Sequence, residues 1–173
     1  MARADWLEAG AALLAGGGSA ALTVDRLCAL TGRTKGAFYH YFRTIAGFEN
    51  ALLSHWGEAN ANRVAAAQTD DDGGLLDLGD LAVGLGTGLE GQVRRWAAVS
   101  EAARQAVAAV DQGRIRLLTR QILALRPGLS PDQAADLALL EYAAFLGLLD
   151  LLPDDDAAQI SRLTALLRDR LMG

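Results

Sequence analysis

Apolar residues recur at spacings of three and four along most of the chain, which is the period of an amphipathic α-helix. In the N-terminal part, helices are predicted over residues 3–15, between Thr23 and Gly32, from Thr34 to about Phe42, and over residues 45–67. Further helical patterns cover residues 75–87, 90–99, 101–126, 131–150 and 156–171. The sequence therefore predicts an all-α protein.

Glycines and capping residues mark where several of these helices begin and end. The run Gly16-Gly17-Gly18 ends the first helix, because glycine is costly inside a helix and suits its C-terminal cap. Thr23 and Thr34 each offer a hydroxyl that can cap a following helix. In Ser130-Pro131-Asp132-Gln133, serine is the cap, proline suits the first helical position, and glutamine completes a capping box.

A linker and an uneven charge distribution both indicate two domains. Asp70-Asp71-Asp72-Gly73-Gly74 is the clearest linker in the sequence. The net charge of the whole chain is −5, yet residues 1–45 hold five basic groups and three acidic ones, whereas residues 66–173 hold ten basic and sixteen acidic ones. A basic N-terminal part is a reason to look there for a site that binds a polyanion. We expect an N-terminal three-helix domain over residues 1–47, joined by the long helix to a helical domain over residues 48–173.

Composition favours a folded protein of a reducing cytoplasm. Of 173 residues, 51% are apolar and three are proline, which allows a sizeable core and long helices. The single cysteine, Cys28, cannot form an internal disulfide, and its place on the apolar face of the second helix favours a packed thiol over a redox sensor. The N-terminus lacks the pattern of an export signal, and no uncharged stretch reaches 18 residues, so no membrane segment is expected.

Residues 23–43 have the pattern of a helix-turn-helix unit, two short helices joined by a tight turn that contains glycine. In the second helix Phe38 and Phe42 are four residues apart and can pack against Leu27. Lys35, Gly36, Tyr39 and His40 fall on the opposite face, where a recognition helix meets the major groove of DNA. Lysine can donate to guanine or to phosphate, the aromatic residues have polar tips, and Gly36 and Ala37 let the backbone approach closely.

The stretch Gly-Arg-Thr-Lys-Gly-Ala-Phe-Tyr-His-Tyr-Phe over residues 32–42 resembles the recognition-helix signature of the TetR family of bacterial transcriptional regulators. The resemblance covers about residues 1–60, while the rest of the chain is similar to the family only in its layout of helices. It implies an N-terminal DNA-binding domain and a C-terminal domain for ligand binding and dimerisation.

The resemblance also implies roles for individual residues. Lys35, Gly36 and His40 would face bases, while the two capping threonines would also touch phosphates. Tyr39 would contact a phosphate or a thymine methyl group. Where relatives carry a phosphate-binding lysine this chain has Ile45, and Arg43 is the candidate to replace that contact. The candidate DNA-binding residues are Thr23, Arg33, Thr34, Lys35, Gly36, Ala37, Tyr39, His40, Tyr41 and Arg43.

The resemblance further implies a small-molecule effector bound within residues 75–150. Candidate walls and polar anchors are Gln92, Arg95, Trp96, Val99, Leu118, Gln121, Ile122, Tyr142 and Phe145, although the apolar ones could instead fill a closed core. Four glycines, Gly84, Gly86, Gly88 and Gly91, would weaken a helix beside this site. The broad apolar surfaces near residues 131–152 and 156–171 predict a homodimer through an intersubunit four-helix bundle, the alternative being that they form the domain core.

We find no residue pattern that would support an enzyme, a cofactor or a metal site. The chain lacks the common catalytic and phosphate-binding motifs, and the triplets Asp70–Asp72 and Asp154–Asp156 lack the ligand spacing of a calcium loop. The function that the resemblance implies is that of a repressor that binds a palindromic DNA operator as a homodimer and is released by an effector. The alternative is a helical protein-interaction module that does not bind DNA.

Overall fold

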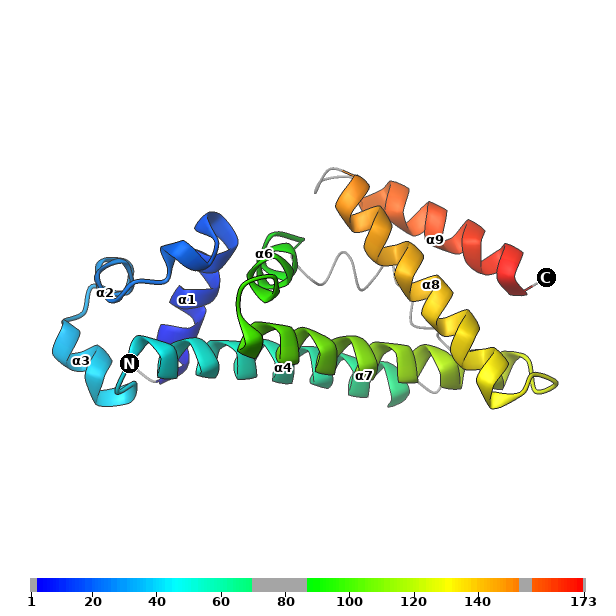
Figure 1. Cartoon of the computed structure of the whole chain (residues 1–173), viewed down its shortest axis with the longest axis horizontal. Coiled ribbons are helices and arrows are strands. Elements are labelled where there is room, and N and C mark those ends of the chain that lie inside the picture. Colours follow the sequence, from blue (N-terminus) through cyan, green and yellow to red (C-terminus); the bar gives the residue numbers. More distant parts are fainter. Residues whose placement is uncertain (1–2, 70–86, 153–156, 173) are drawn as a thin grey trace. The chain divides into compact units, whose positions relative to one another are not determined.

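The computed structural model describes residues 3–69, 87–152 and 157–172, and within these ranges the chain forms helices and no strand (Figure 1). The elements are α1 (Arg3–Gly17), a 3-10 turn η1 (Ser19–Ala21), α2 (Val24–Thr31), α3 (Lys35–Tyr41), α4 (Ile45–Thr69), α6 (Thr87–Ala97), α7 (Glu101–Leu125), α8 (Pro131–Leu151) and α9 (Ala157–Met172). The all-α prediction is confirmed. The linker at residues 70–74, the aspartates 154–156, the glycines Gly84 and Gly86 and nearly all of the predicted helix 75–87 lie outside the described residues.

The chain divides into two compact units whose borders cut through the long helices α4 and α7. Unit 1 comprises residues 1–60 and 88–109, and unit 2 comprises residues 61–87 and 110–173. The functional division expected at residues 47 and 48 stays a prediction.

Unit 1 is built around a cluster of aromatic rings. Phe38 is fully buried, with its ring centroid 5.5 Å from that of Trp6 and 5.6 Å from that of Phe48. Phe42 is also buried and packs edge-on against Phe48. These contacts attach α3 to α1 and to the start of α4, as the four-residue spacing of the two phenylalanines predicted.

Gly10 allows the close approach of α1 to α4 in unit 1. A Cβ atom at this position would lie 2.5 Å from Cζ of Phe48. Any larger side chain would therefore collide with a ring that belongs to the core. This explains a glycine inside a helix, where alanine is otherwise preferred by about 0.5–1 kcal/mol.

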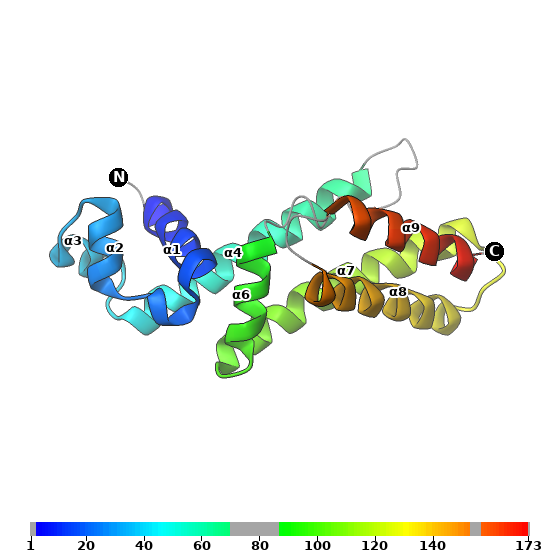
Figure 2. The same cartoon turned by 90° about the horizontal axis from the view of Figure 1, so that it is seen from above.

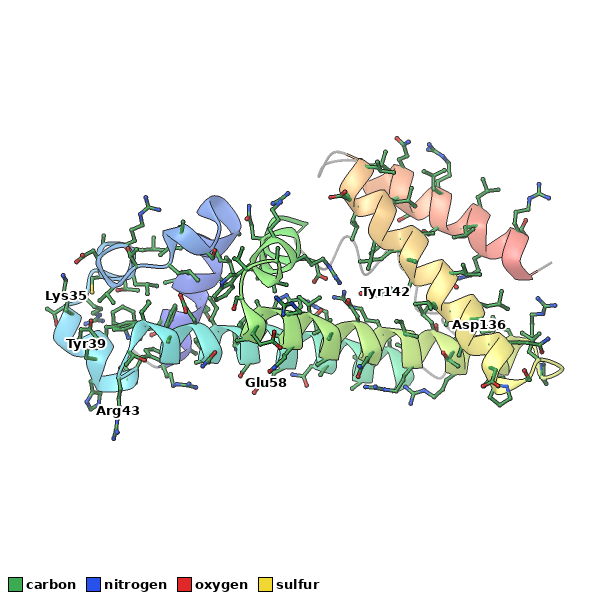
Figure 3. All side chains as sticks on the ribbon, in the orientation of Figure 1. Lys35, Tyr39, Arg43, Glu58, Asp136 and Tyr142 are labelled. Atoms are coloured by element: carbon green, nitrogen blue, oxygen red, sulfur yellow. The ribbon has the colours of Figure 1, made fainter. Side chains whose placement is uncertain are left out.

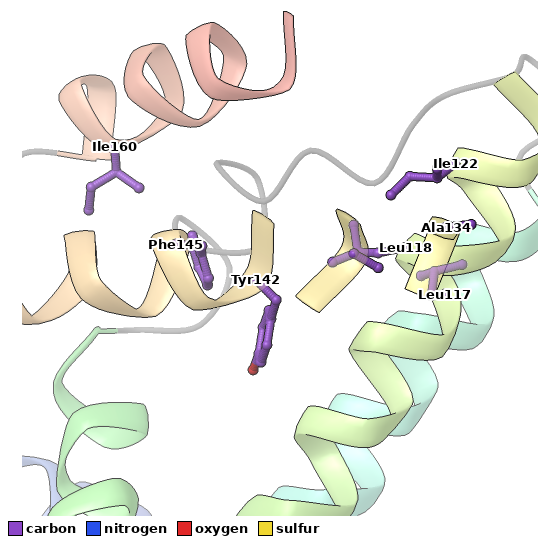
Figure 4. Packing of buried hydrophobic residues seen from close by; sticks show 8 residues of the cluster. Leu117, Leu118, Ile122, Ala134, Tyr142, Phe145 and Ile160 are labelled. Carbon is purple, nitrogen blue, oxygen red and sulfur yellow. The ribbon is translucent and has the colours of Figure 1, made fainter. Parts of the chain in front are cut away.

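Unit 2 has a separate apolar core between α7, α8 and α9. Its buried members include Leu118, Ile122, Tyr142, Phe145 and Ile160 (Figure 4). The helices α8 and α9 contact each other directly, as two views of the structure show (Figures 1 and 2). The capping box expected at the start of α8 is present.

Two polar clusters join the helices of unit 2. Glu141 of α8 is buried and accepts hydrogen bonds from the guanidinium group of Arg168 in α9. The hydroxyl of Tyr142 donates to Oδ1 of Asp111 at 2.7 Å and accepts from Arg114, which is itself buried, at 3.0 Å. Each cluster gives buried polar atoms hydrogen-bond partners, which buried polar groups require.

Several details of the sequence prediction change in the structure. The helix expected over residues 90–99 begins earlier and ends at Ala97, because Ser100 accepts a hydrogen bond from Ala103 and starts α7 instead. Cys28 is a free cysteine that is only half-buried, whereas its position on the apolar face of the helix predicted a buried thiol. Every helix in the described ranges is too short or too polar to cross a lipid bilayer.

Candidate nucleic-acid interface

The segment from Thr23 to Phe42 folds as two short helices joined by a tight turn. Thr23 caps α2, since its hydroxyl accepts a hydrogen bond from the backbone of Arg26, and Thr34 caps α3 in the same way through Ala37. Between them Gly32 adopts a φ of 66°, a left-handed conformation that side chains rarely take. The predicted caps and turn are confirmed, and they set the direction in which α3 leaves the core.

One face of α3 is buried and the other is exposed. Phe38 points into the core of unit 1, whereas Lys35, Tyr39 and His40 lie on the outer surface. Figure 3 shows Lys35, Tyr39 and Arg43 around this short helix, away from Glu58 on α4. Of the ten candidate DNA-binding residues, nine are exposed and Ala37 is half-buried. The structure therefore gathers these residues on and beside α3, where they are accessible.

Ring contacts hold the exposed aromatic side chains in place. Tyr39 packs edge-on against the buried ring of Phe38, with the centroids 5.3 Å apart, and His40 packs in the same manner against Tyr41 at 5.1 Å. Tyr39 is 49% exposed and Tyr41 is 39% exposed. Each ring is thus partly supported by a neighbour while part of the side chain stays exposed to solvent.

One positive charge on this surface is paired with a carboxylate, a contact that the sequence did not indicate. Nζ of Lys35, at the start of α3, lies 2.7 Å from Oδ1 of Asp25 in α2. The hydrogen bond to this carboxylate, followed by its negative charge, raises the pKa of Lys35 above its ordinary value. Lys35 is therefore fully charged at neutral pH and is already paired with an anion in the free protein. Arg33 and Arg43 add positive charge on either side of α3.

The candidate effector residues are divided between the two units. Gln92, Arg95, Trp96 and Val99 belong to unit 1, where Trp96 is buried but Val99 is 82% exposed in the turn after α6. Leu118, Gln121, Ile122, Tyr142 and Phe145 belong to unit 2. Four of these five are members of its apolar core, and Gln121 places a buried side-chain oxygen beside them on α7 without a hydrogen-bond partner. The effector site stays a prediction.

Asp25, Asp111 and Arg114 are polar residues of interest that the sequence did not indicate. Each meets its partner from another helix, so no local spacing signals the contact. In the described residues, no group of three or more histidine, cysteine, aspartate or glutamate side chains is placed to hold a metal ion.

Comparison with known proteins assigns the N-terminal part of the chain. A family model described as "Bacterial regulatory proteins, tetR family" matches residues 7–52, a range that contains α2, the turn and α3. These residues form a TetR-family domain. The resemblance noted in the sequence is thereby confirmed, and the domain supports a function in DNA-binding transcriptional regulation.

Two solved structures share the fold of nearly the whole chain. The reduced form of E. coli NemR is 22% identical, with a TM-score of 0.68, and the match covers 95% of this chain and 96% of NemR. A Rhodococcus sp. protein assigned to the TetR-family transcriptional regulators is 18% identical, with a TM-score of 0.72 and coverage of 99% and 98%. No curated protein sequence matches the chain.

Proposed function

We propose that this chain is a cytoplasmic repressor that binds a palindromic operator as a homodimer and is released by a small-molecule effector. The observation that carries the proposal is the division of α3 into two faces. Phe38 fixes the helix to the core, and Lys35, Tyr39 and His40 are presented outward. A helix presented in this way fits the major groove, where side chains can reach base edges.

The candidate residues divide by chemistry into base readers and phosphate contacts. Lys35 and His40 carry donors that suit base acceptors, and Gly36 and Ala37 leave room for the backbone to come close. Thr34 lies beside them at the start of α3, and its hydroxyl, which accepts from Ala37, still has its own hydrogen to donate to a phosphate. Contacts to the sugar-phosphate backbone are proposed for the remaining candidates, Thr23, Arg33, Tyr39, Tyr41 and Arg43, and Tyr39 would alternatively contact a thymine methyl group.

Exposed leucines on α8 and α9 support the homodimer. Leu139 and Leu140 of α8 are 53% and 58% exposed, and Leu166 of α9 is 53% exposed. An apolar surface of this kind is typical of an interaction site. Two copies of the helix pair, covering residues 131–152 and 156–171, would bury it in a four-helix bundle about a two-fold axis. Sedimentation should show a dimer at micromolar concentration, and the variant Leu140→Glu should shift it toward monomer; a monomeric parent protein would contradict the proposal.

The core of unit 2 offers residues for an effector, and Trp96 on α6 of unit 1 is a separate candidate. Helical bundles bind ligands between facing helices, in mostly apolar surroundings with a few fixed polar groups. Trp96, Tyr142 and Gln121 are of these kinds, so we expect a largely apolar effector with a polar group. Hydrophobic compounds should be screened for release of bound DNA, and the screen repeated with Trp96→Ala and Tyr142→Ala. If both folded variants release as much DNA as the parent, these residues do not line the effector site.

DNA recognition can be tested by selecting duplexes from a random library with the full-length protein. The proposal predicts enrichment of an inverted repeat whose half-sites are about one helical turn, 34–36 Å, apart or a multiple of it. A reporter placed behind the enriched site should be repressed when the protein is present. Failure to enrich any sequence would favour the alternative of a protein-interaction module, and activation of the reporter would contradict the repressor role.

A further inference from the structure

The ion pair between Asp25 and Lys35 lies on the surface that is proposed to meet DNA. Asp25 is the second residue of α2, Lys35 is the first residue of α3, and their charged atoms are 2.7 Å apart. The side chains are 76% and 61% exposed, so the pair is open to solvent and to a ligand. The free protein therefore presents its lysine at the recognition helix already neutralised by a carboxylate.

This pairing changes what Lys35 gains from different DNA contacts. Lysine binds a phosphate as a point charge. At a phosphate, Lys35 would face two anions at once, and Asp25 in α2 would repel the DNA backbone, which the first helix of such a motif crosses. A guanine edge instead offers two neutral acceptors, N7 and O6, and the three N–H donors of lysine allow Lys35 to reach them while it stays paired with Asp25. The carboxylate thus opposes a phosphate contact more than a contact with a matching base.

We propose that Asp25 is a specificity-determining residue: it holds Lys35 back from phosphates, so that Lys35 adds to affinity chiefly where the duplex presents a matching base. The inference rests on the proposed function, in which α3 enters the major groove. Exposed ion pairs are weak, so Asp25 biases Lys35 and does not lock it. The bias acts mainly on unrelated DNA, which a protein binds through phosphates.

The test compares Asp25→Asn with Glu58→Gln, which removes the same charge from an exposed site on α4 (Figure 3). Dissociation constants are measured over a range of salt for a selected duplex and for a scrambled duplex of equal composition. Relative to the control variant, Asp25→Asn should tighten binding to scrambled DNA by about two- to five-fold for each subunit in contact, the range that an exposed pair provides. The salt slope on that DNA should steepen by about 0.9 per subunit, or about 1.8 for the dimer, which corresponds to one added phosphate contact in each subunit.

Affinity for the selected duplex should change less, so the ratio of the two affinities falls in Asp25→Asn. Asp25→Glu, which keeps the carboxylate, should retain the parent ratio. In a Lys35→Ala background, removing the Asp25 charge should tighten binding to scrambled DNA by less than it does in the parent, because only the direct repulsion between Asp25 and phosphates is then relieved. A ratio in Asp25→Asn equal to that of the control would overturn the proposal, as would a gain of the same size without Lys35, because Asp25 would then act only by repelling phosphates.

The outcomes also separate this inference from the proposed function. If the parent protein shows no preference for any sequence, both fail, because there is no specificity to determine. If Lys35→Ala binds the selected duplex as tightly as the parent, the base-reading role fails and the inference fails with it. If Lys35→Ala weakens that complex while Asp25→Asn leaves the affinity ratio unchanged, only the inference about Asp25 fails. Thermal unfolding of each variant confirms that it is folded.

Discussion

Replacing Arg168 with methionine should destabilise the protein strongly, although the residue lies far along the chain from the proposed DNA-binding surface. The Glu141 side chain is 1% exposed, and it accepts hydrogen bonds from Nε of Arg168, at 2.7 Å, and from the neighbouring Nη2. Methionine keeps much of the aliphatic length of arginine and removes the charge. A buried carboxylate that loses its cationic partner costs about 3–5 kcal/mol.

The matched control is Arg104→Met in α7. Arg104 pairs with Glu101, but the two side chains are 58% and 65% exposed. Water solvates a glutamate left alone at such a site, so this variant should cost about 0–1 kcal/mol. The comparison isolates burial, since both pairs join arginine to glutamate and both variants remove the same group.

Urea unfolding at one fixed protein concentration measures both variants, because α8 and α9 also belong to the proposed dimer interface. The midpoint of thermal unfolding should fall by about 6–20 °C in Arg168→Met, at about 2–4 °C for each kcal/mol. The double variant Glu141→Leu/Arg168→Met should recover most of the lost stability, because it buries no lone charge. If Arg168→Met and Arg104→Met differ by less than 1 kcal/mol, or if the double variant is no better than the single one, the reasoning about Glu141 is wrong.

Three further changes test the packing and electrostatics of the units by unfolding. Gly10→Ala should lower the free energy of unfolding by about 1–3 kcal/mol, because the new Cβ meets the Phe48 ring at 2.5 Å. Its control, Gly16→Ala, adds a Cβ that meets nothing within 4 Å and should raise the free energy of unfolding by up to about 0.5–1 kcal/mol. Equal effects of the two variants would contradict the packing described for Gly10. Burial raises the pKa of Glu49 above its ordinary 4.5, so the folded state loses stability as the pH rises above 4.5 and the carboxylate ionises. Glu49→Gln should therefore be more stable than the parent at pH 7. This difference in the free energy of unfolding should shrink when the pH is lowered below 4.5, and a difference that grows would contradict the reasoning. Tyr142→Phe should cost about 1–3 kcal/mol, since it removes a hydroxyl that bridges two charged groups, and a neutral result would show that water replaces it.

The helix-turn-helix could be predicted from the sequence because its signals are local. Thr23 and Thr34 cap backbone groups three residues ahead, and Gly32 provides the left-handed turn between the two helices. The spacing of Phe38 and Phe42 fixes which face of α3 is buried. Each of these signals depends on a few consecutive residues, so the short segment carries enough information for the local structure.

The polar contacts between helices could not be predicted in this way. In α8, Leu140 is 58% exposed while the adjacent Glu141 is buried, because the helix is apolar on nearly every side and its pattern does not select one buried face. The partner of Glu141 is 27 residues away, and nothing near either residue signals the pair. Val99 shows that helix ends are also hard to predict. The sequence pattern placed Val99 on the same helix face as Trp96, but the helix ends before it and the side chain is 82% exposed.

The central claim, that the exposed face of α3 reads base sequence, is tested most directly by repeating the duplex selection with Lys35→Ala. If Lys35 contacts a base, the variant should still enrich an inverted repeat, but with relaxed preference at one or two adjacent positions in each half-site. Its affinity for the parent's best duplex should fall by about 5- to 150-fold for each half-site, the value of one good base contact. Identical enriched sequences and equal affinities for parent and variant would contradict the claim, because Lys35 would then take no part in recognition.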